Sequence, residues 1–162
     1  YSNPSDDNST DNSRGNSGDN TLTGGRGRDI LTGGLGRDTY LLRYYSESVL
    51  QDPLTRRVAY DHITDLAIGT DIIDGPRSIA SGSFTRLTTT ADSLTGDLLN
   101  QLLSTSNLEP FGGAIIELLP ADPAKRRTLL VLNDSAAGYN LNLDSLIEIT
   151  GYTGQLDKLQ II

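Results

Sequence analysis

The sequence has no cysteine and a single histidine, His62, and both shortages narrow the chemistry that is open to it. Without cysteine the chain forms no disulfide and offers no thiolate as a nucleophile or metal ligand. Its formal net charge of −8 argues against nucleic acid as a partner, because nucleic-acid phosphates attract basic surfaces. No apolar run approaches the roughly 20 residues that cross a bilayer as a helix.

The start of the chain carries no visible signal peptide. Since the first residue is Tyr1, we expect the sequence to be a fragment of a longer chain, so this absence excludes no export route. The 162 residues suffice for one domain with a real core or for two small lobes. An extracellular domain without disulfides needs another source of stability, and a bound metal ion can supply it.

Glycine, by contrast, is abundant, and much of it lies in a nine-residue unit that is written three times over residues 15–41. The three copies are GNSGDNTLT, GGRGRDILT and GGLGRDTYL. Glycines so spaced would break a helix, so the unit predicts a loop followed by a very short strand. A flexible Gly/Asp/Ser-rich linker is the alternative, but a linker has no reason to keep a large residue at each eighth position, as at Leu22, Leu31 and Tyr40.

The loop half of each unit suits calcium. Glycines permit positive φ angles and close backbone approach, so several carbonyl oxygens turn inward beside one carboxylate. Ca²⁺ takes about 6–8 hard oxygen ligands of this kind. Because two units make one coil, loops stack at a spacing of eighteen residues, which places Asn20 opposite Asp38 and Asp29 opposite Asp11.

The stretch GGRGRDILTGGLGRDTY, residues 24–40, resembles the RTX nonapeptide repeat GGxGxDxUx of exported calcium-binding proteins. The resemblance implies a parallel β-roll with Ca²⁺ as its cofactor, held between loops that stack eighteen residues apart. One implied site comprises Asn16, Gly18, Asn20, Gly33, Leu35 and Asp38. A second comprises Asp7, Ser9, Asp11, Gly24, Arg26 and Asp29. A third begins with Gly25, Gly27 and Asp29 and has Glu47 as a candidate partner.

Two features of this ligand scheme remain open. Asn20 replaces the family's Asp and lacks its charge, so the first implied site should bind calcium more weakly. Residues 6–11, DDNSTD, are either a degenerate fourth loop, in which Asp11 keeps the nine-residue spacing of Asn20, Asp29 and Asp38, or part of a polar linker over residues 1–14.

Residues 59–75 resemble a segment that commonly follows the last repeat of RTX proteins, D-x-I-x-D-F-x-x-G-x-D-x-I-D, with Leu66 in place of Phe. The alternation predicts two short strands with a turn at Gly69–Thr70. We expect Asp61 or Asp65 to complete the last calcium loop, which begins with Gly34, Gly36 and Asp38; the alternative is that these acids cap turns. The residues expected to cover the open end of the roll are Ile63, Leu66, Ile68 and Ile72.

The remainder, residues 76–162, predicts a small α+β lobe. Leucine spacing over residues 91–108 predicts a helix capped by Asp92 or Ser93, and residues 114–119 and 127–133 predict two strands joined by a turn. Residues 129–154 are similar to the C-terminal domain of cyanobacterial exported RTX-type surface proteins. The polar residues Asn133, Asp134, Asn140 and Asp144 offer either a further calcium site or turn-making side chains.

The expected fold is therefore mainly β: a short parallel β-roll followed by an α+β lobe with one helix and an antiparallel sheet. We divide the chain into a linker or degenerate repeat (1–14), the roll (15–45), a cap segment (46–75) and the lobe (76–162). No enzyme is expected, because His62 has no HExxH or nucleophile motif beside it. The dipeptides Asp52-Pro53 and Asp122-Pro123 are too short to indicate self-cleavage.

The expected function is that of a calcium-binding module in a secreted or cell-surface protein. The resemblance implies type I export with an uncleaved C-terminal signal, followed by folding on Ca²⁺ outside the cell. The alternative is a calcium-stabilised module that binds an acidic polysaccharide, since the roll also resembles the RTX modules of mannuronan epimerases. Tyr44 and Tyr45 lie among seven arginines, Arg14, Arg26, Arg28, Arg37, Arg43, Arg56 and Arg57.

Overall fold

The computed structural model describes residues 10–51 and 59–162. Within these residues the fold is mainly β, with one α-helix, as the sequence predicts. Several residues singled out above lie outside the described ranges, namely Asp7, Ser9, Asp52-Pro53, Arg56 and Arg57. No helix in the described ranges is both long enough and apolar enough to cross a membrane.

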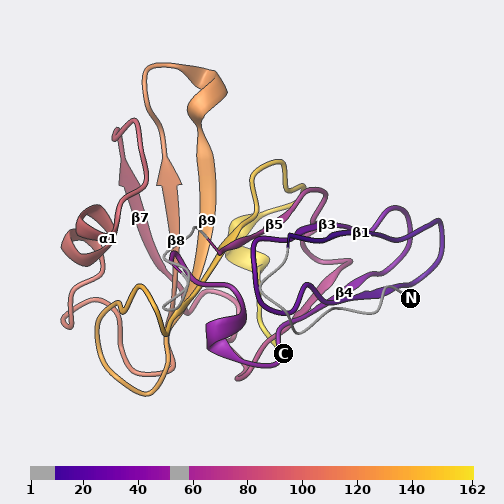
Figure 1. The fold of residues 1–162 in the computed structure, drawn as a ribbon, viewed down its shortest axis with the longest axis horizontal. Helices are drawn as coiled ribbons and strands as arrows, with labels where there is room; N and C mark the ends of the chain where they lie inside the picture. Colours follow the sequence, from indigo (N-terminus) through magenta and orange to yellow (C-terminus); the bar gives the residue numbers. More distant parts are fainter. Residues whose placement is uncertain (1–9, 52–58) are drawn as a thin grey trace.

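The N-terminal repeats form a two-layered parallel β-roll (Figure 1). Strand β1 pairs with β3 and β2 pairs with β4, both in parallel, so consecutive repeats alternate between two sheets. The predicted coil of two repeats is therefore confirmed. The strands are β1 (Asn12–Arg14), β2 (Thr21–Leu22), β3 (Ile30–Thr32) and β4 (Thr39–Leu41).

The segment 59–75 adds one more coil to the roll. It supplies β5 (Asp61–Ile63), which pairs with β3, and β6 (Ile72–Asp74), which pairs with β4. The two predicted strands exist, but each lies in a different layer. Tyr40 is in register with Ile73, so Ile73 faces the core of the roll. Ile72, one of the residues expected to cover the open end, is the next residue along the strand and points to its other face.

The inside of the roll is a column of the large residues from the eighth positions. Leu22, Leu31 and Tyr40 are only 3, 4 and 2% exposed, and Ile63 and Leu66 pack against the same cluster. Fully burying each such side chain stabilises the fold by about 1.5–3 kcal/mol. Strands of two or three residues make few hydrogen bonds, so the roll depends on this column and on its loops.

The C-terminal lobe supplies an antiparallel hairpin, as predicted, and a shorter helix than predicted. Strands β8 and β9 pair antiparallel, β10 extends them, and β7 joins β8 in parallel. The elements are β7 (Thr85–Thr89), α1 (Gly96–Leu102), β8 (Gly113–Leu118), β9 (Arg127–Leu132) and β10 (Ser145–Glu148). The described residues also contain three 3-10 turns, η1 (Tyr45–Glu47), η2 (Pro123–Lys125) and η3 (Leu156–Lys158).

The helix expected over residues 91–108 begins late and ends early. The Thr95 hydroxyl, and neither Asp92 nor Ser93, caps its first turn by accepting from the Leu98 N–H at 3.1 Å. At the other end the Asn107 amide donates to the Leu102 carbonyl at 2.7 Å and closes the helix. The leucine spacing continues because Leu103 and Leu108 stay in the core outside the helix.

Strand β10 joins the roll to the lobe. It pairs in parallel with β5, so seven strands form one sheet in the order β1-β3-β5-β10-β9-β8-β7. One face of this sheet closes the core of the roll, and α1 packs on the other face of its distal half (Figure 1). The end of the chain covers β6, where Ile161 bridges both Ile73 and Ile79. The roll and the lobe therefore share one continuous sheet.

Candidate metal centre

The acids of the repeats form two ladders that run along the roll. In one, the Asp11 N–H donates to Asp29 Oδ1 at 2.7 Å and the Asp29 N–H donates to Asp61 Oδ1 at 2.9 Å. In the other, the Asn20 N–H donates to Asp38 Oδ1 at 2.9 Å. The predicted pairs, Asp11 with Asp29 and Asn20 with Asp38, thus lie together.

The second ladder continues to Asp71, a residue that was not among the predicted site residues. The Asp38 N–H donates to Asp71 Oδ1 at 3.0 Å. Asp71 thus accepts from Asp38 in the same way that Asp38 accepts from Asn20. The sequence Gly69-Thr70-Asp71 has the same G-x-D spacing as the repeats, and this spacing could have identified Asp71 as a site residue. Asp61 lies beside Asp29 and not beside Asp38, so the expectation that Asp61 completes the loop of Asp38 is wrong.

Glycines let the stacked loops come close. Gly34 and Gly36 have φ angles of +100° and +118°, and Gly25 and Gly27 repeat this pattern in the preceding unit. A Cβ built on Gly36 would lie 2.8 Å from the carbonyl oxygen of Gly18 in the loop below. The Leu35 N–H also donates to the Asn16 carbonyl at 3.0 Å, which sets the two loops in register. Loops 15–20 and 33–38 therefore present carbonyl oxygens to one another.

The donor atoms in these loops fit calcium. They are carbonyl and carboxylate oxygens, which Ca²⁺ prefers, and they include no sulfur or imidazole ligand of the kind that favours zinc or copper. Asp38 turns its Oδ2 against Gly33, into space that a Cβ would fill. In the part of the chain that the structure describes, no three His, Cys, Asp or Glu side chains converge on one point, so a cation here depends on backbone carbonyls.

Two carboxylates of the roll, Asp38 and Asp61, lie in surroundings that disfavour negative charge, and a bound cation would offset this effect. Burial raises the pKa of Asp38, which is 1% exposed, and the nearby charges of Asp71 and Asp65 raise it further. Burial also raises the pKa of Asp61 well above its usual range, and the neighbouring Asp29 adds to the effect. Both shifts mean that negative charge is poorly compensated within the roll.

The two rows of loops differ in exposure. Loop 24–29 is largely covered, with Gly24, Gly25, Gly27 and Asp29 buried, whereas residues 34–37 are exposed. Glu47, the candidate partner of the covered loop, is itself 5% exposed. Its Oε2 accepts from the Arg43 N–H at 2.8 Å, and its charge contributes to the raised pKa of Asp61. In the covered row, Asp29 and Glu47 therefore both place negative charge around Asp61.

Asp65 closes the exposed row through three donors. It accepts from the N–H groups of Gly33 and Gly34 and from the Tyr40 hydroxyl, each at 2.9 Å. Burial, followed by this hydrogen bond to Asp65, raises the pKa of Tyr40, so the phenol stays protonated as the donor. The hydrogen bonds favour the alternative in which Asp65 caps a loop.

We expect Asp65→Ala to lower the free energy of unfolding by about 3 kcal/mol, because two N–H groups and one hydroxyl lose their acceptor. Urea unfolding in excess calcium measures this loss. Asp19→Ala is the matched control, since the exposed Asp19 accepts the Arg37 N–H at 2.8 Å and no other donor within the described part of the chain, so its removal should cost below about 1 kcal/mol. Equal losses in the two variants would contradict the capping role.

The polar residues of the lobe make turns. Asp144 accepts from the N–H groups of Asp134 and Asn140 at 2.9 and 2.5 Å, and burial raises its pKa to about 6. The Asn133 amide donates to the carbonyls of Glu109 and Ala136 at 2.7 and 2.8 Å. The turn-making alternative accounts for the contacts of these residues.

Comparison with known proteins agrees with the geometry of the roll. Residues 6–40 match the family of the RTX calcium-binding nonapeptide repeat in four copies. The match begins at residue 6, and β1 and Asp11 lie in register with the next coil, which supports the degenerate-repeat alternative for residues 6–11. No curated protein matches the chain. Residues 6–40 are thus similar to four copies of a repeat that binds Ca²⁺ in its family.

Proposed function

We propose that the chain is an extracellular module that folds when it binds Ca²⁺, after export of its parent protein. RTX repeat proteins are typically exported, and their repeats typically serve as structural or binding modules. The observation that carries the proposal is the stacking of acids along the roll, where Asp38 and Asp61 are buried beside further carboxylates. Bound calcium would supply the positive charge that these loops lack.

The proposed ligands follow the two rows of loops. In the exposed row, a further proposed set is Gly34, Gly36 and Asp38 with Asp65 and Asp71, which accept from the N–H groups of Gly34 and Asp38. In the covered row, Gly25, Gly27 and Asp29 face Asp61, with Glu47 nearby. The proposed exposed site is Asn16, Gly18, Asn20, Gly33, Leu35 and Asp38. The proposed covered site contains Asp11, Gly24, Arg26 and Asp29, together with Asp7 and Ser9, which lie outside the described residues.

Because calcium binding and folding are coupled, the calcium concentration would determine whether the roll folds before or after export. Where calcium is scarce, repulsion among the acids keeps the roll unfolded and fit for passage through a type I channel. Outside, calcium near the roughly 10⁻⁴–10⁻³ M affinity of extracellular modules would drive folding.

Calorimetric titration tests this function. We expect the wild-type chain to bind Ca²⁺ and to show no comparable heat with Mg²⁺, which demands stricter octahedral geometry. Asp38→Ala and Asp29→Ala should each weaken binding at least tenfold for one class of sites, because they belong to different rows. Asp92→Ala removes an exposed acid of the lobe and should change nothing. A wild-type chain that binds no calcium would contradict the proposal.

A second candidate function, binding of an acidic polysaccharide, is favoured by one observation. Arg37, from the last loop of the roll, and Lys158, from the C-terminal segment, line the same cavity. Arg28 belongs to the covered row of loops and Arg37 to the exposed row, so these two arginines do not lie on one stripe. Alginate binding that weakens as salt rises would support this candidate, and the absence of binding would leave calcium-driven folding alone.

A further inference from the structure

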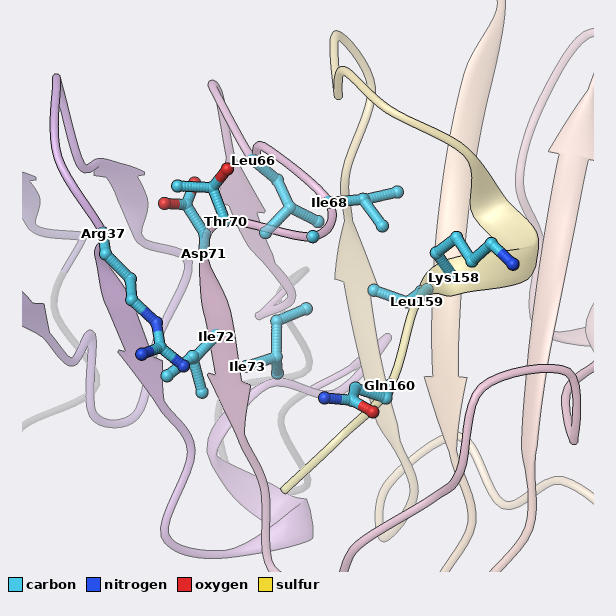
Figure 2. A pocket seen from close by; sticks show the side chains of 11 residues that line it. Arg37, Leu66, Ile68, Thr70, Asp71, Ile72, Ile73, Lys158, Leu159 and Gln160 are labelled. Atoms are coloured by element: carbon cyan, nitrogen blue, oxygen red, sulfur yellow. The ribbon is translucent and has the colours of Figure 1, made fainter.

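A small cavity lies where the C-terminal segment passes the last coil of the roll. Figure 2 shows Arg37 on the side of the roll, and Lys158, Leu159 and Gln160 on the opposite side. Its volume is about 80 Å³, well below the roughly 300–1,000 Å³ of pockets that enclose a whole drug-sized ligand. The cavity can therefore take one end of a ligand and not all of it.

The cavity has an apolar floor and a polar rim. Leu66, Ile73 and Leu159 line it and are 1, 2 and 3% exposed, so they form a fixed apolar surface. The rim residues are Arg37, Thr70, Lys158 and Gln160, and all four are exposed.

The donors on the rim are available to a ligand. Within residues 10–51 and 59–162, the side chains of Arg37, Thr70 and Gln160 have no ion-pair or hydrogen-bond partner. Lys158 pairs with Asp157 at 3.8 Å, and both side chains are about two-thirds exposed, so the pair is weak. Asp71, the one acid of the cavity, already accepts from the N–H groups of Asp38 and Ala67.

We propose that this cavity binds the carboxylate end of a hydroxylated acid, such as a uronic-acid unit at the end of a polysaccharide chain, and this inference rests on the second candidate function. Arg37 would hold the carboxylate, which its guanidinium can engage through two parallel hydrogen bonds. Thr70 and Gln160 would bond ring hydroxyls, and the apolar floor would contact the C–H face of the ring. A neutral sugar would lack the group that Arg37 recognises.

Binding at this cavity depends on calcium through Arg37. The residue lies between Gly36 and Asp38 in the exposed row, so the conformation of that loop places its side chain at the rim. Asp38, Asp65 and Asp71 carry negative charge close to the same loop and oppose an incoming anion. A cation bound there would offset this charge, so calcium and the acid should each raise the affinity of the other.

An NMR titration of the ¹⁵N-labelled chain with methyl glucuronide, in excess calcium, tests the proposal. We expect the amide signals of Gly69, Thr70 and Gln160 to move, and methyl glucoside, which has no carboxylate, to leave them in place. Arg37→Ala should weaken binding at least tenfold. Arg28→Ala is the matched control, because Arg28 holds the same position in the preceding repeat on the other row, and its affinity should equal wild type.

The outcomes separate this inference from the function on which it rests. Equal weakening by Arg28→Ala and Arg37→Ala, or shifts confined to other residues, would overturn the cavity as the site while keeping polysaccharide binding. No response to glucuronide, in a chain whose circular dichroism shows folding on calcium, would overturn the cavity and leave the calcium module intact. Full binding in EDTA, lost in Arg37→Ala, would support the site and overturn its dependence on calcium.

Discussion

Removal of calcium with EDTA should lower the free energy of unfolding by about 5 kcal/mol. Each ion held at a hundredfold excess over its dissociation constant contributes about 2.7 kcal/mol, and the two rows of loops provide at least two proposed sites. This loss is comparable to the roughly 5–15 kcal/mol that holds a whole domain together. The strands of the roll are only two or three residues long, so little else compensates for it.

Urea unfolding followed by circular dichroism, in excess calcium and in EDTA, measures the loss. The seven tyrosines give a second probe, since Tyr40 lies in the core of the roll at 2% exposure. We expect both probes to report one transition, because β5 and β10 join the roll and the lobe in a single sheet. An unfolding free energy that is the same in calcium and in EDTA would contradict the prediction.

Gly36→Ala should destabilise the calcium-loaded chain by about 3 kcal/mol or more. The φ angle of +118° alone costs an alanine about 1–2 kcal/mol. In addition, the new Cβ would lie 2.7 Å from the carbonyl carbon of Gly18, so the two loops would have to separate. Separation would pull the carbonyl oxygens of the exposed row apart and weaken calcium binding there as well.

Gly69→Ala provides the matched control for Gly36→Ala. Gly69 also has a positive φ, +95°, but a Cβ there meets nothing within 4 Å. Gly69→Ala should lower the free energy of unfolding only by the cost of the positive φ angle, about 1–2 kcal/mol, and leave the calcium affinity unchanged. Urea unfolding and calcium titration of the two variants in parallel separate backbone strain from contact between loops. If Gly36→Ala and Gly69→Ala lose the same free energy of unfolding and bind calcium equally well, close contact between the loops at Gly36 is not needed for stability or for calcium binding.

Much of the roll follows from local chemistry and could be predicted from the sequence. The nine-residue step of glycine and acid places a turn in every unit, and one large residue per unit is enough to define an inward face. Because these signals repeat, the pairing of Asn20 with Asp38 and the burial of Leu22, Leu31 and Tyr40 follow from spacing alone. The same spacing identifies calcium, since it brings carbonyls and acids together and offers no soft ligand.

The end of the roll was harder to predict because its spacing changes. Asp61 follows Asp29 by 32 residues in the ladder, and Asp71 follows Asp38 by 33, where the repeats use 18. The chain between β4 and β5 interrupts the step, so counting residues no longer shows which acids meet. The helix was also overestimated, because leucines spaced for one helical face continue past Leu102 into core positions that are not helical.

The sequence by itself determined the repeating part of this protein: the two layers, the stacked loops and their preference for calcium, each set by a nine-residue pattern that recurs along the chain. Only the tertiary structure decided how the roll ends, through the parallel pairing of β5 with β10, the cap that Asp65 places on Gly33 and Gly34, and the cavity between Arg37 and Lys158. These contacts join residues about 30 to more than 100 positions apart. Such pairings depend on the packing of the whole core, which no local pattern encodes.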